Sequence, residues 1–272
     1  AAILIGLLAL CVRLVFDPVE PEVTQPPQPQ TTTAATEPTT EPTTEPTTEP
    51  LTPMEELEAF AAEHDLTLED YPEKILELYE RNPEAREYCM NYPLEYGKEH
   101  KVDISGVDRT QGVPLFLQWD PMWGYEKYGG KFLAISGCGP TCLAMAGYYL
   151  TGDEDMNPLA VAEFAEKNGY YARGYGSSWT LISEGAEKLG LTAKELPLVK
   201  KKMTDALEAG HPVILALGKG DFTTTGHYIV LTGWDGEAFT VNDPNSKERS
   251  SQLWTYEQLE KQIRNIWEIS VE

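Results

Sequence analysis

A Thr/Pro/Glu-rich segment at residues 17–52 is the feature that most limits what this chain can fold into. It ends in a four-residue repeat, Thr-Thr-Glu-Pro, that starts at Thr39 and recurs at 43–46 and 47–50. The segment offers almost no apolar side chains to bury, its prolines favour extended polyproline conformations, and its periodic glutamates repel one another. We therefore expect residues 17–52 to be a disordered, extended linker, with a packed domain only after it.

The residues before this linker are almost wholly apolar. Residues 1–16 read AAILIGLLALCVRLVF, with Arg13 as their one charged residue, and Asp17 follows where a signal peptide would have small residues for cleavage. We interpret 1–16 as the remaining part of a transmembrane or signal-anchor segment that is not removed. At about 3 Å per residue, the linker would hold a domain on the order of 100 Å from the membrane. This predicts an extracytoplasmic protein on a single-pass anchor; a buried helix and a cytoplasmic linker are the alternatives.

The net charge excludes one class of partner. The chain has 44 acidic and 21 basic residues, a formal charge of -23, so phosphate groups of nucleic acid or anionic lipid would be repelled. Its hydrophobic content of 41% is sufficient for a real core. The four cysteines, at positions 11, 89, 138 and 142, show no even spacing and do not indicate a disulfide framework.

Two further regions follow the linker. In residues 53–105, apolar side chains recur at helical spacing and Pro83 is placed to open a short helix, which predicts a small helical segment with Cys89 as a buried thiol. Residues 106–272 mix short helices with alternating apolar strands, a pattern typical of an α+β domain.

Cys138 is predicted to lie at the start of a helix. Gly137 and Gly139 permit a sharp turn around it, and Pro140 suits a first helical turn because it has no N–H to leave unpaired. Unpaired N–H groups and the helix dipole at this position favour a thiolate, the form that attacks a carbonyl, and the same N–H groups suit an oxyanion. A structural cysteine in a glycine-rich turn is the alternative.

Cys142 lies one helical turn after Cys138. Two thiols at this spacing suit zinc or a redox pair, but the histidines at 64, 100, 211 and 227 supply no further ligand at short spacing. We therefore expect no metal site and a buried Cys142.

A predicted hairpin brings a histidine and an aspartate together. A three-residue loop, Trp234 to Gly236, would pair Leu231 with Phe239 and His227 with Asp243 on one face of the ribbon. A one-residue slip would oppose apolar and polar residues, so the pattern favours this register. Asn242, a possible substitute for Asp243, would point to the opposite face.

The pair suggests acid–base chemistry. A carboxylate on one ring nitrogen fixes the imidazole tautomer and leaves the other nitrogen free to take a thiol proton from Cys138. A structural His–Asp pair closing a hairpin is the alternative. The remaining histidines have no carboxylate partner in any predicted element, and His211 is interpreted as a turn residue.

Four motifs resemble those of the peptidase family C-thirty-nine-like domains, relatives of the bacteriocin leader peptidases that cut after double glycines. They lie in the expected order within residues 112–270 and read Gln-Trp-Asp-Pro-Met-Trp at 118–123, Gly-Cys-Gly-Pro-Thr at 137–141, Gly-His-Tyr-Ile-Val-Leu at 226–231 and Val-Asn-Asp-Pro-Asn-Ser at 241–246.

This resemblance implies a papain-like α+β fold and a set of catalytic roles. Cys138 would be the nucleophile, His227 the general base and acid, and Asp243 the residue that orients the imidazole. Gln118 would donate its side-chain amide to the oxyanion. It lies 20 residues before Cys138, farther than in the leader peptidases, so the loop between them must fold back.

The predicted function is a membrane-anchored cysteine peptidase without a cofactor. The transporter and ATPase segments of the leader peptidases have no counterpart here, and no Walker-type phosphate loop occurs, so a peptide, a surface protein or a cell-wall peptide is the expected substrate. A cell-wall amidase or transglutaminase-like enzyme on the same fold and a catalytically silent binding module are the alternatives. The aromatic residues Tyr170, Tyr171, Tyr175 and Trp179 suit either a cleft or a core.

Overall fold

The computed structural model describes residues 50–174 and 176–272. The predicted membrane segment at 1–16, the linker up to residue 49 and Tyr175 lie outside the described residues. Residues 50–272 form one compact unit. Within that unit, no helix combines the length and the apolar character needed to cross a membrane.

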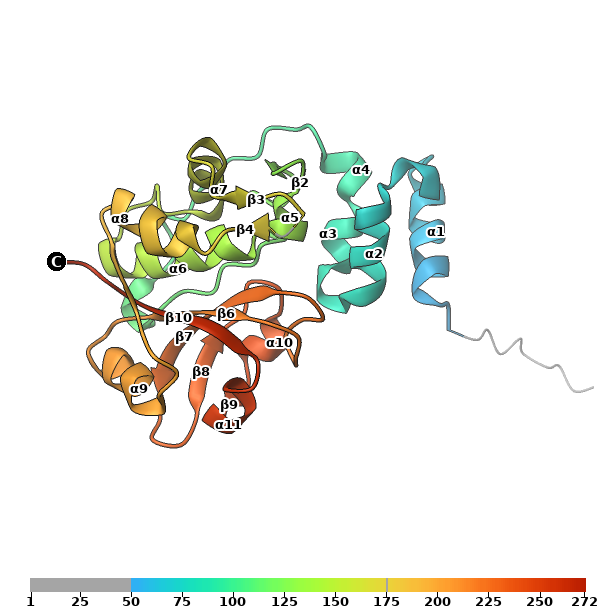
Figure 1. Cartoon of the computed structure of the whole chain (residues 1–272). Helices are drawn as coiled ribbons and strands as arrows, with labels where there is room; N and C mark the ends of the chain where they lie inside the picture. Colours follow the sequence, from blue (N-terminus) through green and yellow to red (C-terminus); the bar gives the residue numbers. More distant parts are fainter. Residues whose placement is uncertain (1–49, 175) are drawn as a thin grey trace, which may run out of the picture. The chain divides into compact units, whose positions relative to one another are not determined.

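Short helices make up the chain from residue 53 to residue 95 (Figure 1). They are α1 (Pro53–Glu63), α2 (Glu73–Arg81), α3 (Arg86–Met90) and α4 (Tyr92–Glu95), with 3-10 turns at Leu68–Asp70 and Pro83–Ala85. A capping box opens α1, in which the Thr52 hydroxyl and the Glu55 carboxylate each accept a backbone N–H. These four helices and two turns are called the helical segment below.

The helical segment packs into the following domain. Its buried residues share one apolar cluster with residues of the domain, and the cluster includes Leu57, Ile75, Leu78, Tyr79, Tyr88, Cys89, Trp119, Tyr125, Phe132 and Ala134. The Tyr88 hydroxyl donates to the Gly124 carbonyl at 2.8 Å, and the Tyr125 hydroxyl donates to the Tyr88 carbonyl at 3.0 Å. Cys89 is buried as predicted, and this burial raises the pKa of its thiol to about 12.

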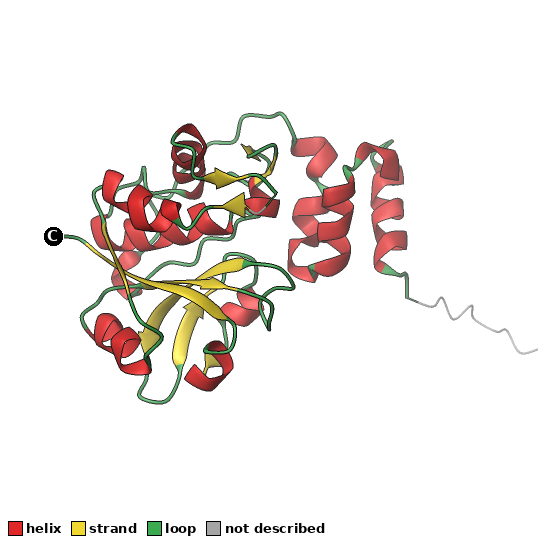
Figure 2. Ribbon diagram, in the orientation of Figure 1, coloured by secondary structure: helices red, strands yellow, loops and turns green. Residues whose placement is uncertain are grey.

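A layer of helices follows, built around α6 (Cys138–Thr151) (Figure 2). Its other elements are a 3-10 turn at Arg109–Gln111, α5 (Leu133–Ser136), α7 (Pro158–Lys167), a π-helical turn at Leu181–Gly185, α8 (Ala186–Lys188) and the small hairpins β1 (Lys127–Tyr128) with β2 (Lys131–Phe132) and β3 (Tyr171–Ala172) with β4 (Gly176–Ser177). Helix α6 is buried along most of its length and forms the centre of this layer.

An antiparallel sheet forms the second layer, and its six strands all lie within residues 192–270. The strand order is β5 (Thr192–Glu195), β10 (Ile263–Ser270), β6 (Val213–Leu217), β7 (His227–Trp234), β8 (Phe239–Asn242) and β9 (Leu253–Trp254). The shorter helices α9 (Lys200–Glu208), α10 (Lys247–Ser250) and α11 (Tyr256–Leu259) connect these strands.

The two faces of the sheet belong to different cores. Tyr228 and Val230 of β7 face the cluster that contains α6, whereas Ile229 and Leu231 belong to a second cluster with residues of α9 and α11. The two sets alternate along β7, as successive side chains of a strand do. Helix α6, which begins at Cys138, thus packs against an antiparallel sheet in which strand β7 begins at His227. The predicted papain-like α+β fold class is confirmed.

The predicted register of the β7–β8 hairpin is wrong. Trp234, placed in the loop by the sequence analysis, pairs with Phe239, and Leu231 pairs with Val241 instead of Phe239. The turn comprises Asp235 to Ala238, because the Asp235 carboxylate accepts the N–H groups of Glu237 and Ala238 at 2.8 Å. A bulge between Leu231 and Gly233 absorbs one further residue.

The error does not move the histidine and the aspartate to different faces. At Leu231 the observed register differs by two residues from the predicted one, and a shift of two preserves the face on which every side chain lies. His227 pairs across the sheet with Leu217 of β6, and Asp243 lies just beyond β8. The two residues are therefore close on one face without being a directly opposed pair.

Candidate active site

Cys138 is the first residue of α6, as the glycine pattern predicts, and its side chain is partly exposed. The turn before it requires glycine, because a Cβ at Gly137 would lie 2.5 Å from the Leu133 carbonyl oxygen. A Cβ at Gly139 would lie 2.6 Å from the Ser177 hydroxyl. The close packing on both sides fixes where the helix begins and holds the sulfur at its end.

Cys142 has a different environment from Cys138. It is fully buried within α6, as predicted, and burial together with the nearby Cys138 raises the pKa of its thiol well above the ordinary value. Of these two cysteines, only Cys138 is open to a reagent or a substrate.

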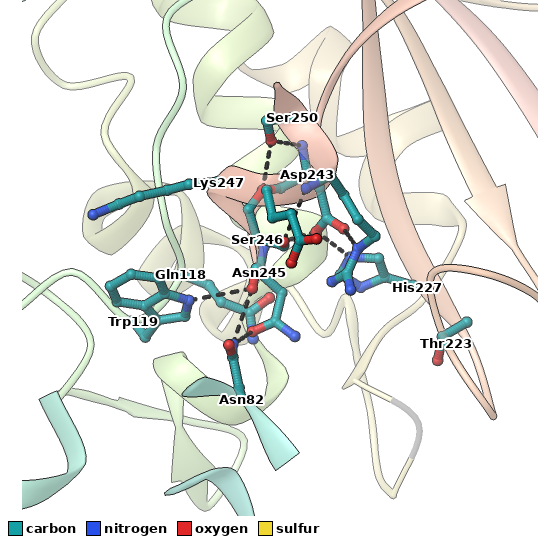
Figure 3. Close-up of polar contacts among 12 residues, drawn as sticks. Asn82, Gln118, Trp119, Thr223, His227, Asp243, Asn245, Ser246, Lys247 and Ser250 are labelled. Atoms are coloured by element: carbon teal, nitrogen blue, oxygen red, sulfur yellow. Dashed lines mark hydrogen bonds and ion pairs between the residues drawn. The ribbon is translucent and has the colours of Figure 1, made fainter. Parts of the chain in front are cut away.

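His227 and Asp243 form a buried ion pair (Figure 3). The imidazole Nε2 and the carboxylate Oδ1 are 2.7 Å apart. Asp243 is completely buried and His227 is 9% exposed. Because Nε2 faces the carboxylate, Nδ1 is the ring nitrogen left to exchange a proton with another group.

The electrostatics of the pair favour the charged imidazole. Burial alone would lower the pKa of His227, but the charge and hydrogen bond of Asp243, followed by those of Cys138, raise it to about 10. Burial opposes ionisation of Asp243 too, yet His227 and the Arg249 guanidinium hold the pKa of this carboxyl below its ordinary value. The arrangement therefore keeps an imidazolium beside the Cys138 sulfur at neutral pH.

Gln118 comes close to the same site by a loop that folds back. Its backbone N–H donates to the Pro244 carbonyl at 2.7 Å, and its side-chain Nε2 donates to the Ala134 carbonyl at 2.6 Å. The side chain is buried, its Oε1 has no hydrogen-bond partner among the described residues, and only one of the two Nε2 hydrogens is used within the protein. The 20-residue spacing from Cys138 is accommodated by the hairpin of β1 and β2, where Gly129 and Gly130 both have positive φ.

The structure adds partners of Asp243 that the sequence analysis missed. The Arg249 Nε donates to Asp243 Oδ2 at 2.5 Å, the Asn245 N–H donates to Oδ1 at 2.8 Å, and the Ser250 hydroxyl accepts the Asp243 N–H at 2.9 Å. A signal was present in Ser246, which caps α10 by accepting the Arg249 N–H. A helix predicted from that cap would have turned Arg249 and Ser250 back toward the aspartate.

Asn242 does not compete with Asp243 for the histidine. Its side-chain amide donates to the carbonyls of Val113 and Pro114 on the other side of the strand. This placement agrees with the face predicted for it.

Two other histidines have carboxylate partners, contrary to the sequence analysis. His211 Nδ1 is 2.8 Å from a Glu268 oxygen, and His100 Nε2 is 3.1 Å from a Glu95 oxygen. The first contact joins a loop to the last strand across 57 residues, which no local pattern reveals. Neither histidine lines the cleft described next.

Cys138, His227 and Gln118 line one cleft with a volume of about 530 Å³. Ile135 and three further parts of the chain also line it: Arg81 to Glu84 of the helical segment, Gly220 to Gly226 before β7, and Asn245, Ser246, Glu248 and Arg249 around α10. Most of these side chains are polar.

Tyr170, Tyr171 and Trp179 do not line this cleft. Tyr170 is buried in the core around α6, and Tyr171 packs edge-on against Tyr128. Trp179 is 50% exposed and contacts Trp267. Of the two roles left open for these residues, Tyr170 belongs to the core.

The fold and the site together define a cysteine peptidase-like domain. Comparison with protein-family sequence models matched residues 110–272 to the Peptidase_C39 like family. The chain belongs to this family, as its four motifs indicated. A search of curated proteins gave no match.

Solved structures of two related domains are similar to this chain. The peptidase domain of Streptococcus ComA, a bi-functional ABC transporter involved in a quorum sensing pathway, is 18% identical, with a TM-score of 0.43 over 59% of this chain and 99% of that domain. A putative C39-like peptidase from Bacillus anthracis is also 18% identical, with a TM-score of 0.34 over 62% of this chain and 97% of the other.

Proposed function

We propose that this protein is a cysteine peptidase that hydrolyses peptide bonds through a thioester on Cys138. The observation that carries the proposal is the position of His227, with its Nε2 bound to buried Asp243 and its pKa raised in part by Cys138. A histidine that only closed a hairpin would need no thiol beside it. Here the thiol lies in an open cleft.

In the first half of the proposed reaction, the Cys138 thiolate attacks the carbonyl carbon of the scissile peptide bond. The oxyanion that forms accepts a hydrogen bond from the free Nε2 hydrogen of Gln118 and from the backbone N–H at the start of α6. The His227 imidazolium then gives its proton to the leaving amine, and the C–N bond breaks. Asp243 keeps the ring in the orientation needed for this transfer.

In the second half, a water molecule replaces the departed amine. The now neutral His227 takes a proton from this water, which attacks the thioester carbonyl. Collapse of the second tetrahedral intermediate breaks the C–S bond and releases a carboxylic acid, and the proton on His227 restores the ion pair with the Cys138 thiolate. No metal or organic cofactor takes part in this proposed cycle.

The proposal also places the domain outside a cell membrane. It rests on the apolar residues 1–16 as an anchor and on the extended Thr/Pro/Glu linker after them. A peptidase in this position would act on extracellular peptides, surface proteins or cell-wall peptides. Expression of the full chain in cells, followed by protease treatment of intact cells, tests it: an accessible domain in the membrane fraction is expected, and a protected domain would contradict it.

Product analysis tests the chemistry. The full chain is incubated with a peptide library and, separately, with muropeptides, and the products are identified by mass spectrometry. We expect new carboxyl termini at peptide bonds in peptide substrates, and none with the Cys138→Ala variant. Cleavage restricted to amide bonds of muropeptides would instead indicate a wall amidase, and amine exchange without hydrolysis would indicate a transglutaminase-like enzyme. Binding of either substrate without turnover would indicate a binding module.

A further inference from the structure

We infer that the helical segment supports the active site, with Glu84 and Asn82 as positioning residues that hold Asp243 in place through α10. This inference rests on the proposed function, because it concerns how the proposed triad is held. Both residues precede residue 110, where the family match begins.

Glu84 holds the beginning of α10. One carboxylate oxygen accepts the Ser246 hydroxyl at 2.5 Å, and the other accepts the Lys247 N–H at 2.7 Å. The Glu248 N–H also points to this carboxylate, at 3.3 Å. These N–H groups belong to the first turn of a helix, where no carbonyl of the helix itself can accept them and a negative charge is stabilising.

Asn82 holds the turn before α10. Its side-chain amide donates to the Asn245 carbonyl at 3.0 Å and lies 3.2 Å from the Asn245 side-chain oxygen (Figure 3). Asn82 is buried, and its own oxygen accepts the Glu84 N–H at 3.1 Å. The connection between α2 and the 3-10 turn is therefore stabilised by a hydrogen bond of its own. The same Asn82 side chain also binds Asn245, 163 residues later.

Helix α10 connects these contacts to Asp243. Arg249 and Ser250, at its end, bind the Asp243 carboxylate and the Asp243 N–H respectively. Asp243 in turn binds His227. A continuous series of hydrogen bonds thus runs from the helical segment through α10 to the imidazole.

The helical segment also borders the cleft without filling it. Arg81, Asn82, Pro83 and Glu84 line the same cleft as Cys138 and His227. A segment that blocked the site would occupy the position of the substrate. The geometry here points instead to a wall of the cleft that supports the site.

The test measures the alkylation of Cys138 by iodoacetamide against pH in the full chain, with the modified residue identified by mass spectrometry. The variants are Glu84→Ala, Glu84→Gln and Asn82→Ala. The control is Glu80→Gln, which removes an exposed carboxylate from the neighbouring helix α2. Alkylation needs no substrate, so it reports on the state of the thiol and imidazole even before a substrate is identified.

We expect Glu84→Ala and Asn82→Ala to slow alkylation near neutral pH by about tenfold and to shift its pH profile, as loss of an outer partner of an active-site group does. Glu84→Gln, which keeps one acceptor oxygen, should lie between Glu84→Ala and the unsubstituted chain, and Glu80→Gln should match that chain. Glu84→Gln provides the same comparison if Glu84→Ala does not fold.

Two results would overturn the inference in distinguishable ways. If folded Glu84 and Asn82 variants react at the unsubstituted rate across the pH range, the helical segment has no positioning role although the proposed function stands. If Cys138 of the unsubstituted chain reacts no faster than a free thiol at neutral pH, the proposed function fails and the inference fails with it.

Discussion

Asp243 is the residue on which most of the polar contacts of the site converge. It is fully buried, and its carboxylate accepts hydrogen bonds from His227, Arg249 and the Asn245 N–H. A buried carboxylate is stable only when its charge is paired and its oxygens are hydrogen-bonded. Two cations and a backbone donor meet that need, and one of the cations is the proposed catalytic base.

Asp243→Asn tests this charge arrangement through its pH dependence. Burial lowers the pKa of His227, and the Asp243 carboxylate is the main charge that opposes this effect. Without that carboxylate the pKa of His227 falls, so the imidazolium loses its proton at a lower pH. We expect Cys138 of Asp243→Asn to be alkylated at least about tenfold more slowly at pH 6–7, in the way that the loss of an orienting aspartate impairs a catalytic histidine. An unchanged rate in a folded variant would contradict a role for the ion pair in activating the thiol.

The same shift affects stability. A pKa raised from the ordinary 6.5 to about 10 on folding contributes stability that is complete below about pH 6.5 and declines as the pH rises toward 10. The free energy of unfolding of the unsubstituted chain should therefore fall across this interval, and Asp243→Asn should show a flatter profile in urea titrations at each pH. Equal slopes in the two proteins would contradict the assigned shift.

Residues whose roles depend on local sequence were predictable, and residues that act across the fold were not. The start of a helix at Cys138 follows from the glycines and proline around it, and the shared face of His227 and Asp243 follows from strand alternation. Glu84 carries no such pattern, because its contact with Ser246, 162 residues later, exists only after the helical segment has packed against α10. The only local signal for Arg249 was the Ser246 cap of the short helix that carries it. The proposed role of Gln118 came from a family resemblance, not from its neighbours.

At the scale of elements, the β7–β8 hairpin shows that the face of a strand residue can be predicted correctly even when its pairing partner is not. The alternating pattern specifies the face of each strand residue, and that part held. The length of the turn depended on the Asp235 side chain, whose hydrogen bonds to Glu237 and Ala238 favour a longer turn than the glycine alone suggested. The pairing partners were therefore wrong while the site residues remained on the same face.

Gly137→Ala tests the junction between α5 and α6. The added methyl group would lie 2.5 Å from the carbonyl oxygen of Leu133, which itself accepts the Gly137 N–H at 2.8 Å. We expect the free energy of unfolding to fall by about 1–3 kcal/mol, the usual cost of overpacking. Urea titration measures it, with Gly106→Ala as the control because no atom lies within 4 Å of the added Cβ there. Equal stability of the two variants would show that the junction can relax.

At the scale of the whole molecule, the helical segment and the peptidase-like domain share a core. Tyr88 and Leu78 of the segment belong to the same apolar cluster as Trp119 and Phe132 of the domain. Apolar surface buried between two parts couples their unfolding, since neither can open without exposing it to water. The sequence analysis placed a boundary between the helical segment and the following domain at about residue 105. In the structure, residues from both sides of this boundary pack into one apolar cluster.

Calorimetry of Leu78→Ala tests this coupling. Leu78 is fully buried, and its truncation should cost about 2–5 kcal/mol. We expect one unfolding transition, displaced as a whole to lower temperature, whereas Leu51→Ala, at a residue that is 52% exposed, should leave the transition in place. Two separate transitions, with only one displaced by Leu78→Ala, would contradict a shared core.

The most direct test of the proposed peptidase is the labelling of its nucleophile. The full chain, Cys138→Ala and Cys142→Ala are treated with a thiol-directed peptidase probe at neutral pH, and the labelled peptide is identified by mass spectrometry. The account predicts a label on Cys138, complete loss of it in Cys138→Ala and full retention in Cys142→Ala. Equal labelling of the two variants would contradict the assignment of Cys138 as the nucleophile.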